Sequence, residues 1–441
     1  MRQAKTRRDF LKLAAAGAGL LGLAACAPAA APAPQATGVP AAATQAPAKA
    51  GTKQVLDMWT HFAGANLEIM NKLIEEFRKD NSDIEFKITA YGSGEIGTKL
   101  LAAVAGGAPP DIFHAPGWVP PDFAYNGVLA TLDDVVKLPV KPLKNFDGIT
   151  IYNGARYGVP VNGGLAAMCY NKSLLDAAGV KKLPETWDEL VEAGKLVTKG
   201  SQWGVLIPNK PDQNTSQVGY SLLMAAGGEL LTPDGKEPAF NSAAGLETLQ
   251  FAADLIQKHK IQPVKSYGLL DTWTDYGNGQ IGGICLYPVW LANIKTFKFQ
   301  SVTAQMPKLK GPGAHFAGNY WTLLATKKKE KAEPFKRFTE WWFQPQINAR
   351  WCKDTGGTPT SQETIDDPVY KKFLQDEPAA KAYIDSLAYA KPFPGVLGVT
   401  AVVQIFAETW ETVSLGKSTP KDALAAAEKR ASEELKRAQK R

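Results

Sequence analysis

The chain has 441 residues, enough for two or three domains of ordinary size. Its hydrophobic fraction of 45% and charged fraction of 21% are those of a globular protein, which excludes general disorder and a polytopic membrane protein. The net charge of +7 falls to +3 without the basic residues 1–25. Charge therefore gives no argument for nucleic-acid binding.

The first residues predict an export signal. Arg7 and Arg8 precede an apolar stretch, residues 13–25, that is too short to cross a bilayer as a stable helix. The run around the two arginines resembles a twin-arginine export signal, and Leu23-Ala24-Ala25-Cys26 resembles a bacterial lipobox. We therefore expect a signal peptide over residues 1–25 and lipidation at Cys26.

A tether follows the signal. Residues 27–51 are almost wholly Ala, Pro, Gln, Thr and Gly, a composition that cannot bury enough apolar area to fold. The sequence predicts a tether over residues 26–52 and a folded body that starts near Thr52. The expected location is extracytoplasmic, with the protein held by lipid on the outer face of the cytoplasmic membrane, at the cell surface or in the periplasm.

Strands and helices alternate along the body. Hydrophobic periodicity predicts, in chain order, a strand over 55–60, a helix over 67–80, a strand over 84–88, a helix around 100–104, strands over 111–114 and 165–170, a helix over 186–200, a helix over 243–260, a strand over 281–287, and helices beyond 326 and from 419. Thr186 and Glu189 form a capping-box pattern at one helix start. The β-α-β order predicts a parallel or mixed sheet covered by helices. The lysine run 327–331 is interpreted as a solvated helix start.

Catalytic and metal motifs are not found. Gly92-Ser93-Gly94-Glu95-Ile96-Gly97 matches a dinucleotide-binding pattern, but no acidic residue follows at the required distance, so a flexible loop is favoured. The four histidines are scattered, and neighbouring carboxylates are those of ordinary helix surfaces. The four cysteines form no C-x-x-C pair; a Cys169–Cys285 bridge stays open beside buried free thiols. We expect no enzyme activity, no cofactor and no metal.

Tryptophans stand out instead. Several of the eleven lie in Gly, Pro or Asn-rich turns at the ends of predicted strands, where ligands of α/β sheets collect. An exposed indole offers a flat apolar face to a sugar ring, and neighbouring amides can bind hydroxyl groups. Each of these residues has core packing or turn capping as its alternative role. The candidates from this argument are Trp118, Trp290, Trp321, Asn162, Gln213, Asn214, Gln217 and Asn319.

Several stretches together resemble the extracellular solute-binding proteins of ABC importers, family 1. They are Val104–Ile112, Asn126–Asp134, Tyr157–Pro160, Tyr170-Asn171-Lys172, Pro184–Leu190 and Gly279–Trp290. The resemblance implies an α/β fold of the two-lobed periplasmic-binding-protein class (type II), with hinge strands and a central ligand cleft. It implies one lobe from 53–162 and 306–360 and another from 163–305 and 361–441, with crossings near 162–165 and 303–307.

The resemblance also implies which residues line the cleft. They are Trp59, His61, Phe62, Pro116, Gly117, Trp118, Asn162, Gln213 and Gln217, with Trp290 from the second lobe and Asn319 and Trp321 from the returning first lobe. Few Arg or Lys lie in these loops, and the carboxylates typical of maltodextrin binders are not evident, which favours a neutral saccharide over a phosphate ester.

The expected function is therefore capture of a sugar or oligosaccharide and its delivery to an ABC permease, by a protein that is a monomer. One alternative is a binding protein of the same family for glycerol phosphate or another polyol or anion. Alternatives of other classes are a surface-anchored carbohydrate-active enzyme and a scaffold lipoprotein with an inactive cleft.

Overall fold

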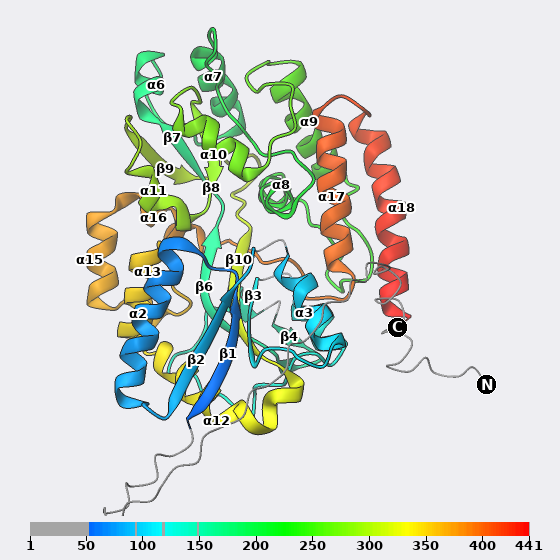
Figure 1. Ribbon diagram of the computed structural model, residues 1–441. Helices are drawn as coiled ribbons and strands as arrows, with labels where there is room; N and C mark the ends of the chain where they lie inside the picture. The colour runs from blue at the N-terminus through cyan, green and yellow to red at the C-terminus, as the bar shows by residue number, and fades with distance from the viewer. Residues whose placement is uncertain (1–52, 93–94, 117–119, 148–149, 441) are drawn as a thin grey trace, which may run out of the picture.

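The computed structural model describes residues 53–92, 95–116, 120–147 and 150–440, and Figure 1 shows them as two lobes. The signal peptide, the tether, Cys26, Arg7 and Arg8 lie outside the described residues, as do Ser93, Gly94, Gly117 and Trp118. Among the described residues no helix is both long enough and apolar enough to span a membrane.

The first lobe is built on a five-stranded sheet of order β2-β1-β3-β10-β6. Strand β1 runs parallel to β2 and β3, whereas β10 is antiparallel to β3 and β6. Its strands are β1 (Gln54–Thr60), β2 (Ile84–Ala90), β3 (Ile112–Pro116), β6 (Val159–Leu165) and β10 (Phe316–Leu323). Around it lie α2 (Gly64–Asp80), α3 (Ile96–Ala105), α4 (Pro120–Tyr125), α5 (Lys144–Asp147), the hairpin β4 (Ile151–Tyr152) and β5 (Ala155–Arg156), η3 (Ala325–Lys327), α12 (Lys328–Trp342), α13 (Pro345–Thr355), α14 (Gln362–Ile365) and α15 (Pro368–Asp376).

The second lobe is built on a three-stranded antiparallel sheet of order β8-β7-β9. Its strands are β7 (Ala167–Asn171), β8 (Gly283–Leu286) and β9 (Ser301–Gln305). The surrounding helices are α6 (Lys172–Ala177), α7 (Trp187–Val197), α8 (Gln213–Ala225), α9 (Ala243–Gln257), α10 (Leu269–Gly277), η2 (Pro288–Trp290), α11 (Leu291–Ile294), α16 (Pro378–Ser386), α17 (Val399–Ser414) and α18 (Pro420–Gln439). Helices α17 and α18 lie side by side along one edge (Figure 1).

The chain crosses from one sheet to the other and back. Strand β6 ends at Leu165, and after Ala166 the chain enters β7 of the other sheet; it returns from β9 to β10. Glycine is required in β6, because a Cβ at Gly163 would lie 2.3 Å from the ring of Phe316. The single strand predicted over 165–170 is therefore two strands that belong to different sheets.

Most predicted elements are confirmed. The capping box of Thr186 and Glu189 is present at the start of α7, but the helix ends at Val197 rather than at Gly200. The helix predicted over 243–260 ends at Gln257, and the strand predicted over 281–287 spans Gly283–Leu286. The last helix begins after Thr419 and buries the apolar side chains predicted to face inward: Leu424, Ala431 and Leu435.

One expectation about side chains needs correction, and one open alternative is decided. Lys327 and Lys331 do not simply face solvent: their Nζ atoms lie 3.7 and 3.5 Å from the carboxylate of Asp111, which is 4% exposed. Cys169 and Cys285 are both free. Cys169 is opposite Ile284 while Cys285 is opposite Met168, so the two thiols point to opposite faces of the sheet and cannot form a bridge.

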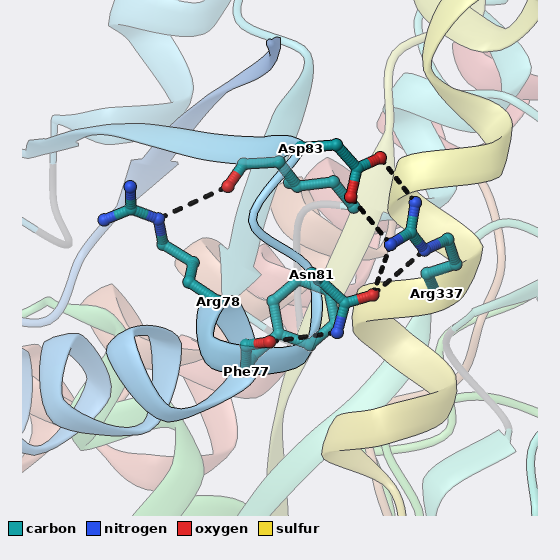
Figure 2. A network of polar contacts seen from close by, with 6 residues as sticks. Phe77, Arg78, Asn81, Asp83 and Arg337 are labelled. Atoms are coloured by element: carbon teal, nitrogen blue, oxygen red, sulfur yellow. Dashed lines mark hydrogen bonds and ion pairs between the residues drawn. The ribbon is translucent and has the colours of Figure 1, made fainter. Parts of the chain in front are cut away.

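A polar network fixes the far end of the first sheet (Figure 2). The Arg337 guanidinium of α12 donates to both carboxylate oxygens of Asp83, at 2.8 and 2.9 Å, and to Oδ1 of Asn81. Asn81 in turn donates from Nδ2 to the carbonyl of Phe77 at the end of α2. The network ties the turn between α2 and β2 to α12.

Candidate functional site

The strands that connect the lobes bring two predicted residues together. Asn162 of β6 is opposite Asn319 of β10, and the Asn319 amide donates to Oδ1 of Asn162 over 3.4 Å. Asn162 is fully buried, and its Nδ2 has no hydrogen-bond partner among the described residues. The loop after α13 packs closely on this amide, since a Cβ at Gly357 would lie 2.5 Å from Nδ2. A buried amide donor without a partner is costly, which makes it a candidate to meet an enclosed ligand.

Two histidines extend this group toward the end of β1. His61 Nδ1 lies 3.2 Å from the carbonyl of His114, and the nearby Asn319 side chain partly offsets the effect of burial on the pKa of His61. The Nδ1 of His114 pairs with the Thr60 hydroxyl at 2.8 Å, while its buried Nε2 has no partner among the described residues. Burial lowers the pKa of His61 to about 4 and holds that of His114 well below its usual range. The whole group is therefore uncharged at neutral pH.

The second lobe contributes aromatic residues beside the same strand. A Cβ at Gly164 would lie 3.4 Å from the Tyr287 ring, so the turn after β8 touches β6 two residues beyond Asn162. The Tyr287 hydroxyl is buried and without a partner in the described structure, and burial keeps its pKa well above the ordinary value. Trp290, three residues on in η2, is half-buried.

A further buried polar atom belongs to the loop after α13. Thr358 exchanges two backbone hydrogen bonds of 2.8 Å with Gly163, and its hydroxyl has no partner among the described residues. Asn162, Thr358 and Tyr287 thus place uncharged hydrogen-bonding groups along one short stretch of β6. Such groups suit a ligand rich in hydroxyls, and no described group of three or more His, Cys, Asp or Glu residues could hold a metal ion.

The family model described as "Bacterial extracellular solute-binding protein" matches residues 64–349. This chain belongs to that family. An arabinooligosaccharide-binding protein of Halalkalibacterium halodurans is 24% identical to this solute-binding protein over 333 residues, which are 72% of this chain and 74% of the relative. A lactose-binding protein of Rhizobium radiobacter is 25% identical over 301 residues, 63% of this chain and 68% of the relative.

Solved structures share the fold of this solute-binding protein. The cyclic α-maltosyl-1,6-maltose binding protein of Arthrobacter globiformis superposes with a TM-score of 0.77 at 24% identity, over 87% of this chain and 100% of the other. UgpB of Mycobacterium tuberculosis, in complex with glycerophosphocholine, gives 0.78 at 20% identity, over 87% and 99%. The predicted two-lobed periplasmic-binding-protein architecture is confirmed.

The predicted cleft residues of this solute-binding protein have different surroundings. His61, Asn162 and Asn319 lie together, as described. Trp59 is half-buried with its ring edge-on to Tyr91, at 4.7 Å between centroids. Phe62 is 7% exposed and packs on Trp351, as a core residue does.

Helix α8 carries two further candidates. Gln217 is 3% exposed, and its backbone carbonyl accepts a hydrogen bond from the Ser221 hydroxyl at 2.9 Å. Gln213 is the first residue of α8 and Asn214 the second, after the Asp212 cap, and their side chains are outside what the structure describes. Gly117 and Trp118 are also outside it, and so is the Pro116 side chain.

Trp321 was expected in the cleft, and this is wrong for the conformation described. Its ring is fully buried and stacks on Phe338 of α12, with centroids 4.4 Å apart and 15° between planes. Trp321 lies two residues beyond Asn319 on β10, where α12 already covers the sheet. Asn319, two residues earlier and on the same face of β10, is half-buried. The strand pattern therefore predicted the face correctly but not the burial of Trp321.

Sequence reasoning missed three residues around the site: His114, Thr358 and Tyr287. Tyr287 belongs to the aromatic turn that had been singled out for Trp290, so that signal was available. His114 follows a strand pattern as any core residue would, and Thr358 carries no pattern at all. Only the packing of distant segments brings Thr358 against Gly163.

Proposed function

We propose that this solute-binding protein holds an uncharged carbohydrate between its two lobes and delivers it to the permease of an ABC importer. The observation that carries the proposal is an uncharged group at the strands between the lobes: fully buried Asn162, whose Nδ2 has no partner among the described residues, with half-buried Asn319 and His61. Sugar hydroxyls can both donate and accept, so they satisfy amide and imidazole groups without any ion pair. The similarity of this chain to an arabinooligosaccharide-binding protein and a lactose-binding protein supports the same ligand class.

The residues proposed to contact the sugar are Trp59, His61, Gly117, Trp118, Asn162, Gln213, Gln217, Trp290 and Asn319, joined by Tyr287 and Thr358. Side-chain amides select hydroxyl positions, and the indoles supply apolar area for the faces of sugar rings. The proposed lobe boundaries are 53–162 with 306–360, and 163–305 with 361–441. Packing suggests one refinement: residues 361–376, which contain α14 and α15, belong with the first lobe, because Tyr370 lies in the core of that lobe.

A ligand screen tests the proposal. Any ligand that binds only the native state raises the unfolding temperature by mass action. We expect a rise with arabinotriose, lactose or maltose, and none with glycerophosphocholine, because a phosphodiester brings a charge that the described site does not match. Stabilisation by glycerophosphocholine or another anion alone would reject the carbohydrate proposal. Release of shorter sugars during incubation would instead favour the enzyme alternative; we propose that the protein has no catalytic activity.

The proposed location rests on the N-terminal sequence. We propose export through the arginine pair Arg7 and Arg8, lipidation at Cys26, and a monomer held at the outer face of the cytoplasmic membrane. Cys26→Ser should move the protein from the membrane fraction to the medium or periplasm, while sugar binding is unchanged. Retention of Cys26→Ser in the membrane fraction would reject the lipid anchor.

A further inference from the structure

A continuous row of aromatic rings lies behind Trp290. Its ring contacts Trp273 of α10, with centroids 4.8 Å apart and 38° between planes. Trp273 contacts Phe297 at 4.7 Å and 43°, and Phe297 contacts Tyr276 edge-on at 5.7 Å. Tyr276 is fully buried, whereas the other three rings are half-buried. The row thus connects a surface turn to the core of the second lobe.

The inner end of this row is fixed. The Tyr276 hydroxyl lies 2.9 Å from the Ser301 hydroxyl and 3.4 Å from Sγ of Cys169. The Phe297 ring rests on the helix backbone, because a Cβ at Gly277 would lie 2.8 Å from it. Neither ring can move without disturbing the sheet or the helix. Trp273 therefore links a rigid support to the indole of Trp290.

We propose that Trp273 is a positioning residue that holds the Trp290 ring in the orientation in which it stacks on the ligand. The inference rests on the proposed function, in which Trp290 contacts sugar. An unsupported indole on a surface turn has several rotamers and loses that freedom when a ligand binds. An indole held by Trp273 has already lost this rotamer freedom when the protein folds. Binding then costs less conformational entropy, so more of the stacking free energy contributes to affinity.

A double-mutant cycle tests the inference on the purified full chain, by calorimetric titration with arabinotriose, lactose and maltose. For the sugar that the wild type binds best, we expect Trp273→Ala and Trp290→Ala each to weaken binding about tenfold. Because Trp273 acts through Trp290, adding Trp273→Ala to Trp290→Ala should cost less than about twofold more. Trp273→Phe, which keeps a flat ring, should restore most of the affinity.

Trp203 supplies the matched control, because it is a half-buried indole of the same core that belongs to no part of this row. Trp203→Ala should leave the affinity within about twofold of the wild type. In the ligand-free protein, the circular dichroism of the coupled indole pair should disappear in both Trp273→Ala and Trp290→Ala, but not in Trp203→Ala.

Additive losses in the cycle, or unchanged affinity in Trp273→Ala, would overturn the positioning role while leaving the proposed function intact. A wild type that binds none of the three sugars would overturn the proposed function and this inference with it. If Trp273→Ala fails to fold, the cycle is run with Trp273→Phe and Trp273→Leu, for which a graded loss through Trp290 is expected.

Discussion

Replacement of Asn162 by alanine should separate binding from stability. The side chain accepts a long hydrogen bond of 3.4 Å from the Asn319 amide, and its buried Nδ2 has no partner in the part of the chain that the structure describes. Losing the bond costs up to about 1 kcal/mol, and removing an unsatisfied buried donor returns about 1–3 kcal/mol, part of which the small cavity offsets. The free energy of unfolding without ligand should therefore change by less than about 1 kcal/mol. Sugar affinity should fall by about tenfold or more, equivalent to at least about 1.4 kcal/mol, because the ligand loses its amide donor.

Asn348 is the matched control for this experiment. It is a fully buried asparagine whose Nδ2 donates to the carbonyl of Val161, the neighbour of Asn162, over 3.1 Å. Asn348→Ala leaves that carbonyl unpaired, so the free energy of unfolding should fall by about 2 kcal/mol while sugar affinity is unchanged.

Two assays are needed for this pair of variants. Urea denaturation of the ligand-free protein gives the free energy of unfolding, and calorimetric titration gives the dissociation constant. If Asn162→Ala loses more than about 2 kcal/mol of stability and keeps wild-type affinity, the amide is structural and the proposed site is refuted.

Three further outcomes are expected. Asp111→Ala should lower the free energy of unfolding by about 2–3 kcal/mol and leave the sugar affinity unchanged. The reason is that the Asp111 carboxylate accepts a hydrogen bond of 2.9 Å from the Asp57 backbone and faces Lys331. A loss of stability near zero would contradict this. Burial lowers the pKa of His315 to about 3, so as the pH falls the unfolded state binds a proton before the folded state does. The free energy of unfolding should therefore decrease as the pH drops from about 6.5 toward 3. In denaturation curves His315→Gln should flatten this pH dependence, and an unchanged slope would count against it. Asp122 of α4 accepts a hydrogen bond of 3.2 Å from Thr400 in the first turn of α17, which is a contact between the lobes. Asp122→Ala removes this contact and should speed sugar dissociation about threefold in stopped-flow fluorescence. An identical rate would show that the contact does not hold the lobes together.

Local patterns were sufficient for most individual elements. The alternation in Ile84–Ala90, the helical spacing of Phe335, Phe338 and Trp342, and the capping box at Thr186 depend on neighbours a few residues away. Because strand and helix periods are properties of the local chain, the sequence predicted an α/β protein correctly. The predictions failed at the ends of helices and strands. The helix predicted to reach Gly200, for example, ends at Val197, because tertiary contacts decide the last turn.

The candidate site shows a similar division. Turn and strand-end patterns suggested Asn162 and Asn319, and the family resemblance added His61. The structure brings them together because the antiparallel strands β6 and β10 pair Asn162 with Asn319, and His61 follows β1 of the same sheet. The prediction for Trp321 was wrong about its burial. The strand face was as expected, but helix α12 covers that position. Thr358 and Trp273 had no local signal, since their roles come from segments far away in the chain.

The sequence by itself determined the order of strands and helices, the uncharged character of the residues at the strand ends and the resemblance to solute-binding proteins. Only the tertiary structure decided that Cys169 and Cys285 point apart, that Lys331 meets a buried carboxylate, and that Trp321 is core. The physical reason is that periodicity specifies which face a side chain is on, whereas its neighbours across that face come from segments brought together only by folding.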